Sequence, residues 1–518
     1  MRRATLLVAT SLLVTPALTR GAMAQQASPY LPTGHWATPY LEHLIARGVV
    51  EDPTPLTRPF VASDVVRVLT AADTMRLNGA ERHMVRAILA ELRRPPSPSP
   101  EHPDGRPWAR VDGDVAVAGA SQARRDPLRA EGGGPGHATA AGGLALQALF
   151  GPVTLVTHPS FDTRLKYDPE YAGKKDRFVA GRNAEAYGDV RWKFGEVCFG
   201  SLDRNWGPPE VESLIFSSAP YSYDHVTLAI GTRRLQLQAA VTQLDDLPDT
   251  SGTPNHRYFI VHRLLWRPGG GTRTTLGLWE GEIAAGPART LEPWFANVLN
   301  LGLLVEYDRR VAVNSLLGAD WETRLGRTGS SKLFAQLLLD DIQIDRGTAA
   351  DSEPASYGLT LGAQTALRDV VFTGYYTRVA NLTYRTPNPA ETVESRFVGL
   401  GRNFSDYEQA TLRASLLAAP GVLLSPEATL LRQGEGDFRL PYPPVAAYGT
   451  TPTIFAGVVE RTVRLALGAA WQRSAWGLTG NGGVHFVTNA GHVTGVRDTQ
   501  WVGRIALSYR FHVQGALP

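Results

Sequence analysis

The sequence predicts a mainly β protein, a transmembrane antiparallel β-barrel of about 16–18 strands preceded by a small N-terminal helical module. Apolar side chains recur at every second residue from about residue 108 onward, the spacing of strands with one apolar and one polar face. After residue 24, no apolar run is long enough for a membrane-spanning helix. The chain of 518 residues contains 52 Gly, 17 Tyr, 17 Phe and 11 Trp, which suits the turns and aromatic girdles of a barrel.

Residues 1–24 have the order of a cleaved secretory signal peptide. Two arginines precede an apolar stretch from Leu6 to Leu18, and a small-residue cleavage site follows. The alternative is a membrane anchor, but the stretch is shorter than the roughly 20 residues that a spanning helix needs. Export implies an oxidising compartment. With Cys198 as its single cysteine, the chain can form no intramolecular disulfide.

A small helical module is predicted for residues 25–94. Its first helix carries Trp36–Ile45, its second begins at Ser63 as the N-cap, and its third starts with a capping box of Asn78 and Glu81. We expect this module to lie in the periplasm against the mouth of the barrel. Its aromatic and glycine spacing also faintly resembles surface-layer-homology modules, which hold cell-wall polymers.

The predicted barrel covers residues 108–518, after a stiff Pro-rich linker at 95–107. The segment Asn183–Phe194 is its best example of a strand. The even-numbered residues of this segment are apolar or glycine, whereas most of the odd-numbered residues are polar or charged, so one face suits lipid and the other suits water. A turn is predicted at Gly195 and Glu196.

Further segments alternate in the same way. They are Tyr258–Trp266, Leu301–Tyr307, Leu333–Leu339, Arg461–Trp471 and a C-terminal strand that ends near Phe511. A soluble β-sandwich would alternate as well, but its interior would be apolar, whereas here the polar faces are rich in charge. At about 22 residues per strand, and with an even strand number, the barrel should have 16 or 18 strands.

An ordered set of motifs runs through the first half of the predicted barrel. They are Leu202-Asp203-Arg204-Asn205-Trp206-Gly207-Pro208, Ser213–Ser217, Gly277-Leu278-Trp279-Glu280, Gly318-Ala319-Asp320 and Phe334–Asp341. In order and spacing these residues resemble the capsule assembly Wzi family, and the similarity extends from about Trp192 to Ile344. The resemblance implies an outer-membrane barrel of about 18 strands, occluded by helices on the periplasmic side, that helps attach capsular polysaccharide to the cell surface.

Four residues of these motifs are candidate polysaccharide ligands: Arg204, Trp206, Trp279 and Glu280. An indole can stack on the apolar face of a sugar ring, while guanidinium and carboxylate groups hydrogen-bond to hydroxyls or uronic acids. The alternative is structural, with Trp206 in a rigid turn and the charged residues in salt bridges across the lumen.

The sequence gives no support for a metal, a cofactor or a catalytic site. Aspartates at 245–249 and 340–345 lack the glycine spacing of a calcium loop. The 12 histidines form no zinc motif, and no Gly-x-Ser-x-Gly elbow is present. We therefore expect a protein that is not an enzyme.

The predicted function is a non-catalytic bacterial outer-membrane barrel that helps attach or assemble capsular or surface polysaccharide. The alternatives are a general or sugar-selective diffusion porin and an outer-membrane hydrolase. The expected partners are the polysaccharide, outer-membrane lipid and the barrel-assembly machinery, with the protein as a monomer. A net charge of +3 gives no reason to expect nucleic acid.

Overall fold

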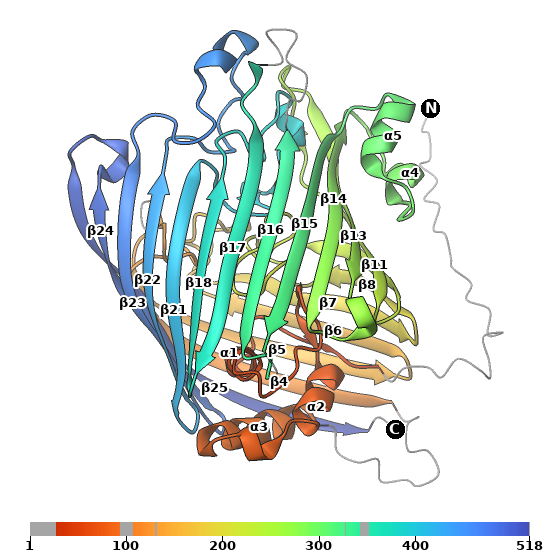
Figure 1. The fold of residues 1–518 in the computed structure, drawn as a ribbon, viewed down its shortest axis with the longest axis vertical. Helices are drawn as coiled ribbons and strands as arrows, with labels where there is room; N and C mark the ends of the chain where they lie inside the picture. The colour runs from red at the N-terminus through yellow and green to blue at the C-terminus, as the bar shows by residue number, and fades with distance from the viewer. Residues whose placement is uncertain (1–26, 94–106, 130–131, 327, 342–351, 517–518) are drawn as a thin grey trace, which may run out of the picture.

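The computed structural model describes residues 27–93, 107–129, 132–326, 328–341 and 352–516. The predicted signal peptide and nearly all of the Pro-rich linker lie outside these residues. Eighteen long strands form a closed barrel (Figure 1), within the predicted range. They are β4 (Trp108–Ala120), β5 (His137–Phe150), β6 (Val153–Asp162), β7 (Ala180–Trp192), β8 (Gly195–Ser201), β10 (Asp224–Gly231), β11 (Leu235–Gln243), β13 (Pro254–Trp266), β14 (Thr274–Gly286), β15 (Asn314–Leu325), β16 (Ser331–Asp341), β17 (Ser356–Leu367), β18 (Val370–Val379), β21 (Tyr407–Ala419), β22 (Val422–Gln433), β23 (Glu460–Arg473), β24 (Trp476–Thr488) and β25 (Arg497–Ala516).

Each long strand pairs antiparallel with the next along the chain, and the last strand, β25, closes the ring by pairing with the first, β4. Short turns, such as residues 193–194 between β7 and β8, join the strands at one end. Long loops, such as residues 202–223 and 380–406, join them at the other end. The N-terminal helices lie at the short-turn end (Figure 1). In outer-membrane barrels the short turns face the periplasm, so the long loops are extracellular.

The two faces of the wall have opposite character, as β7 illustrates. Glu185, Tyr187, Asp189 and Arg191 point into the lumen and are buried, while Val190 is exposed on the outer face. A soluble protein would place the apolar face inside, so this inverted burial is the arrangement expected of a wall in contact with lipid. No helix in the described residues has the length and apolar character needed to cross a membrane.

The helical module consists of α1 (Thr38–Ala46), α2 (Ala62–Thr70) and α3 (Gly79–Leu92). The predicted capping box is present, because the Asn78 side chain accepts from Glu81 N while the Glu81 carboxylate accepts from Asn78 N. The second helix begins at Ala62 with Val61 as its N-cap, so the prediction of Ser63 as the cap is wrong. The backbone just before α2 is held by two short antiparallel sheets. One pairs β1 (Tyr30–Leu31) with β3 (Phe60–Val61), and the other pairs β2 (Thr57–Arg58) with β9 (Asn205–Trp206).

The module plugs the periplasmic end of the barrel. Tyr40 Oη donates to the Gly421 carbonyl over 2.8 Å, and His43 Nδ1 shares a 2.9 Å hydrogen bond with Ser415 Oγ. Apolar residues of α1, α2 and α3 form one buried cluster with Leu417 and Leu423 from the barrel. The module is therefore packed against the barrel rather than tethered near it.

Three details of the predicted strands differ from the structure. Residues 301–307 are not a strand, because Gly302–Arg309 form a helix, α5. Apolar residues at 301, 303, 305 and 307 alternate, but Leu301, Leu304 and Val305 also have the spacing of a helix, and periodicity does not separate the two in so short a run. The β7–β8 turn lies at 193–194, just before the predicted position, and β25 continues past Phe511 to residue 516.

We predict that acid weakens the docking of α1. Burial, reinforced by Arg47 and opposed by Asp369, lowers the pKa of His43 to about 4. An exposed histidine titrates near pH 6.5, so an undocked module takes up a proton first as the pH falls. Docking stability should be complete above about pH 6.5 and fall toward pH 4 by roughly 1 kcal/mol per pH unit.

Hydrogen exchange of residues 38–46, corrected for the intrinsic effect of pH, measures this. His43→Gln should retain docking at low pH better than the wild type. Identical pH profiles for the two proteins would contradict the assignment to His43.

Candidate functional site

Two extracellular loops, residues 202–223 and 380–406, fold into the barrel and fill part of its lumen. The Ser217 amide donates to the Leu400 carbonyl over 2.9 Å, and Tyr384 Oη donates to the Leu214 carbonyl over 2.6 Å. The loops and the inner faces of the strands share one apolar core, whose loop residues are Trp206, Leu214, Ile215, Phe216, Tyr384, Val393, Leu400 and Phe404. The lumen is therefore packed along β13–β18.

A buried polar centre fixes the first of these loops to the wall. The Asp320 carboxylate accepts hydrogen bonds from Arg263, from Trp279 Nε1 over 3.2 Å and from Gln336 Nε2 over 2.6 Å. Gln336 Oε1 in turn accepts from Leu214 N over 2.7 Å. Because a buried carboxylate is costly unless it is paired and hydrogen-bonded, this network specifies one position for the loop.

The motifs that carry the family resemblance converge at this centre. Gly207 lies so close to Gln336 that a Cβ at Gly207 would be 2.8 Å from Gln336 Nε2. Ser213 Oγ donates to the Trp206 carbonyl over 2.6 Å. Motifs that are far apart in the sequence thus all contribute contacts that hold the loop of residues 202–223 inside the barrel.

The four predicted ligand residues do not form one site. Trp206 and Trp279 both belong to the packed lumen core. Arg204 is buried, donates from Nε to His225 Nε2 over 2.9 Å and lies over the Tyr30 ring. Glu280 follows Trp279 on β14 and therefore faces the opposite, outer side of the wall. Packing accounts for the three lumen residues, and a ligand role for any of the four stays a prediction.

The opposite side of the lumen is open to water. Several inward-facing residues of β23, β24, β25 and β4 are small and partly exposed, unlike the buried inner faces of β14–β17, although Arg464 and His485 on the same strands are buried. The small residues include Ala116, Ala118, Ala466, Asn481, Ala506 and Ser508. We call this space the vestibule. Arg504 of β25 is also exposed there, within electrostatic range of Arg164 and Tyr221 at the extracellular mouth.

At the mouth, two loops and the start of β7 bring arginines onto one aromatic ring. The guanidinium carbon of Arg125 lies 4.1 Å from the centroid of the Tyr221 ring, and that of Arg182 lies 4.9 Å from it. Arg164 donates to Tyr221 Oη over 3.0 Å, and Tyr221 Oη donates to Asp168. Burial raises the pKa of Tyr221 above its usual value, so the hydroxyl stays protonated.

A second group of arginines adjoins the first around Asn403. Arg129 donates to the Asn403 carbonyl over 3.0 Å, and Arg439 donates to Asn403 Oδ1 over 2.6 Å. Asn403 Nδ2 donates to Glu170, which also pairs with Arg124 at 3.1 Å. Burial, together with the nearby Arg124 and Arg439, lowers the pKa of Arg129, which marks a crowded cationic surface.

We call these two groups the Arg–Tyr surface: Arg125, Arg182 and Tyr221, with Arg129, Asn403 and Arg439. Asn403 is buried, Arg439 is exposed and the other members are half-buried, and all lie at the mouth of the vestibule. Guanidinium forks recognise carboxylates, and aromatic faces stack on sugar rings. The prediction from sequence missed this surface because its residues come from four separate loops and the start of β7. Only the adjacent Arg124 and Arg125 are a local signal.

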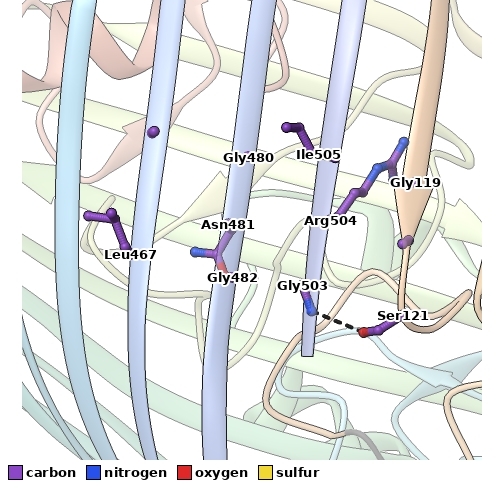
Figure 2. A pocket seen from close by; sticks show the side chains of 11 residues that line it. Gly119, Ser121, Leu467, Gly480, Asn481, Gly482, Gly503, Arg504 and Ile505 are labelled. Carbon is purple, nitrogen blue, oxygen red and sulfur yellow. Dashed lines mark hydrogen bonds between the residues drawn. The ribbon is translucent and has the colours of Figure 1, made fainter. Parts of the chain in front are cut away.

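A shallow groove of about 440 Å³ crosses β23, β24, β25 and β4 (Figure 2). Gly480, Gly482 and Gly503 lie in it between the exposed side chains of Leu467 and Ile505. These side chains point outward, so this groove faces lipid rather than the vestibule.

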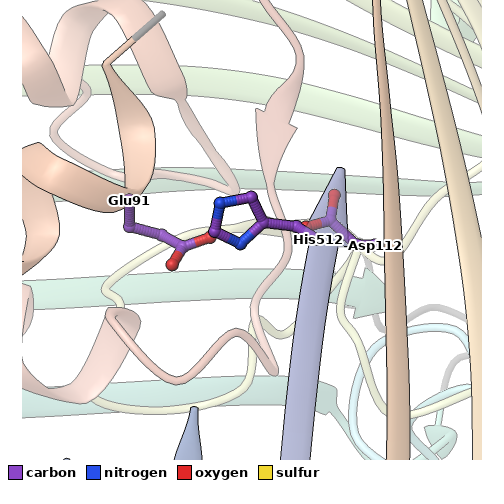
Figure 3. Close-up of side chains that lie close together, drawn as sticks. All are labelled: Glu91, Asp112 and His512. Carbon is purple, nitrogen blue, oxygen red and sulfur yellow. The ribbon is translucent and has the colours of Figure 1, made fainter. Parts of the chain in front are cut away.

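Glu91 of α3 approaches Asp112 and His512 on the inner face of the barrel seam, with one ligand atom from each within 4.8 Å of the others (Figure 3). Arg110 forms ion pairs with both Glu91 and Asp112. The guanidinium already occupies the space between the two carboxylates and pairs with both. We therefore interpret this group as a clamp between the module and the β4–β25 seam.

No protein-family model and no curated protein matches the chain. Among solved structures, the chain is similar to Wzi of Escherichia coli, with 14% identity and a TM-score of 0.62. Wzi is an outer-membrane protein involved in group 1 capsule assembly and is described as a carbohydrate-binding β-barrel. That match covers 95% of this chain and 100% of Wzi. OccK3 and OprD of Pseudomonas aeruginosa are 11% and 12% identical, with TM-scores of 0.45 and 0.44, and each match covers 79% of this chain and 96% of the other. The chain has the fold of Wzi, a bacterial outer-membrane barrel.

We predict that Asp320→Ala releases the inward loop. This change leaves the buried Arg263 guanidinium without the carboxylate that pairs with it. The free energy of unfolding should therefore fall by about 3–5 kcal/mol. Chemical unfolding in detergent micelles, followed by near-ultraviolet circular dichroism, measures the change. Asp176→Ala, at an exposed loop position, is the control and should have almost no effect. Equal stability of the two variants would show that the network does not hold the loop.

Proposed function

We propose that this protein is a non-catalytic outer-membrane barrel that binds an acidic surface polysaccharide at its extracellular mouth and helps hold that polymer at the cell surface. The observation that carries the proposal is the Tyr221 ring with the guanidinium groups of Arg125 and Arg182 against it. The fold supports the proposal, since Wzi shares it and is described as carbohydrate-binding.

The chemistry of the Arg–Tyr surface suits uronic acids. The free N–H groups of a guanidinium can bind a sugar carboxylate in a bidentate manner, and ring faces can pack against the C–H groups of the sugar. Asp168 and Glu170 already accept hydrogen bonds from Tyr221 and Asn403, and Asp437 pairs with Arg439. Each sugar unit must compete with these carboxylates. Contacts to single units are therefore weak, and a polymer gains affinity by engaging several at once.

We predict that the pair of changes Arg125→Gln and Arg182→Gln weakens binding of alginate, a polyuronate, by about tenfold, which corresponds to roughly 1.4 kcal/mol. Retention of the purified protein on immobilised alginate, with neutral dextran as the comparison polymer, measures the effect. Arg233→Gln, on a periplasmic turn, is the matched control and should bind as the wild type does. No retention of the wild type on any polysaccharide would refute the proposal, and equal loss in the control would remove the mouth as the site.

The vestibule favours a second candidate, a sugar-selective passage. Its small inner residues leave water-accessible space, while the clamp of Glu91 with Arg110 and the stacking of Arg510 on Trp36 close its periplasmic end. A passage would therefore require movement of the helical module. The described contacts favour a closed resting state.

We predict that the wild type is silent in a planar bilayer and that Glu91→Ala increases its conductance, because the change removes the link between α3 and Arg110. Single-channel recording measures this. Asp64→Ala, on the exposed side of α2, controls for general loosening of the module and should leave the current unchanged. A steady current through the wild type would favour the porin function over the proposed one.

A further inference from the structure

A helical hairpin lies against the outside of the barrel. The loop between β14 and β15 contains α4 (Pro293–Ala296) and α5 (Gly302–Arg309), which cover the outer faces of β13 and β14 near the extracellular end (Figure 1). Phe295 and Val305 pack on Ile260 and Ala284 of the wall. The hairpin thus occupies a place where the other strands would contact the bilayer directly.

The hairpin covers three ionisable residues on the outer face of the wall. His262 and Glu280 lie opposite each other on β13 and β14, and His262 Nδ1 is 3.0 Å from Glu280 Oε1. Glu282 follows on the same face, is fully buried, and both of its carboxylate oxygens lack a hydrogen-bond partner in the described residues. The assignment to the outer face follows from β14 itself, since Trp279 and Ile283 point into the lumen core.

These residues lie within the apolar part of the wall. On their own strands they are adjacent to Leu264 and Leu278, which are 38% and 63% exposed on the outer surface. Acidic groups in contact with acyl chains are unfavourable, so the cluster needs a cover. The hairpin supplies it: the Gly302 amide donates to both Glu280 oxygens over 2.9 and 3.0 Å.

The outward side of the hairpin is also apolar. Leu301, Leu304 and Tyr307 are 58%, 59% and 75% exposed, although Val305 on the other side is buried. Apolar side chains therefore lie both on the side of α5 that packs on the wall and on the opposite side, which suits a helix between a protein and a membrane. Glu306 is half-buried and accepts a hydrogen bond from Ser315 Oγ of β15 over 3.2 Å. The exposed charged residues of the hairpin's second helix, Asp308, Arg309 and the following Arg310, are at its extracellular end.

We propose that the α4–α5 hairpin is embedded in the outer leaflet, where it shields the His262, Glu280 and Glu282 cluster and binds a phosphorylated membrane lipid. The acyl chains pack on Leu301, Leu304 and Tyr307, in continuity with Leu278 of the wall. The lipid phosphate pairs with Arg310 at the extracellular end, where cationic side chains complement the headgroup layer. This site is on the opposite side of the wall from the vestibule and is independent of the proposed glycan binding.

Bromine quenching tests the embedding. Leu304→Cys and Asp308→Cys are each labelled with bimane, which is selective because the natural Cys198 is buried. In vesicles of phosphatidylcholine with brominated acyl chains, the label at 304 should be strongly quenched and the label at 308 much less. A label at Arg233→Cys, on a periplasmic turn, gives the quenching expected of a position in water. Quenching at 304 no greater than at 233 overturns the proposal.

Native mass spectrometry tests the headgroup contact. Protein extracted from vesicles that contain phosphatidylglycerol should retain this lipid, and Arg310→Asn should lose it. Asparagine suits the variant because Arg310 has a positive φ of 53°. Arg233→Asn should retain the lipid as the wild type does. Equal retention by Arg310→Asn and the wild type overturns the phosphate contact.

Replacing residues 290–312 with a short Gly-Ser turn tests the cover. This variant should lose the folded band that resists detergent before boiling, and the additional changes Glu280→Leu and Glu282→Leu should restore it. A variant that stays folded with both glutamates in place, or is not rescued by the leucines, contradicts the shielding role.

Discussion

A bilayer solvates no charge, and this constraint governs where every ionisable side chain of the barrel can lie. On β7 the charged residues point inward, where Arg191 lies over the Tyr30 ring of the N-terminal segment and Arg182 donates to Ser222 of a loop. Asp320 is surrounded by three donors in the packed half of the lumen. Glu280 and Glu282 point outward, and there a separate pair of helices covers them. The plug, the inward loops and the hairpin each supply partners or cover for ionisable side chains of the wall.

The sequence predicted what depends on local patterns. Alternation identified β7 and its two faces, and Asn78 with Glu81 identified the start of α3, because both signals depend on residues within a few positions of each other. The same logic failed for α5. There Leu304 is apolar between the alternating residues, and exposed Leu301, Leu304 and Tyr307 lie opposite buried Val305, so α5 lacks the continuous polar face that normally distinguishes a helix.

The candidate site was less accessible to prediction. The motifs around Trp206, Trp279 and Asp320 are prominent because many contacts meet at them, yet the structure places them in a packed core. The Arg–Tyr surface depends on how the loops after β4, β8, β18 and β22 meet the start of β7, and no spacing within one segment records that. Rigid motifs position the loops, and the exposed side chains of the loops are available for ligands.

The pairing of β25 with β4 has a consequence for biogenesis. Because the first and last strands of the ring are neighbours, the cylinder cannot be sealed until the final strand has arrived, whereas the helical plug emerges before any wall exists. The plug rests on β21 and on the turn before β22, which are late strands. The apolar surface of the plug therefore needs temporary protection during secretion. The last stage of insertion must bring the plug against the β4–β25 seam, where Glu91 of the plug pairs with Arg110 of β4.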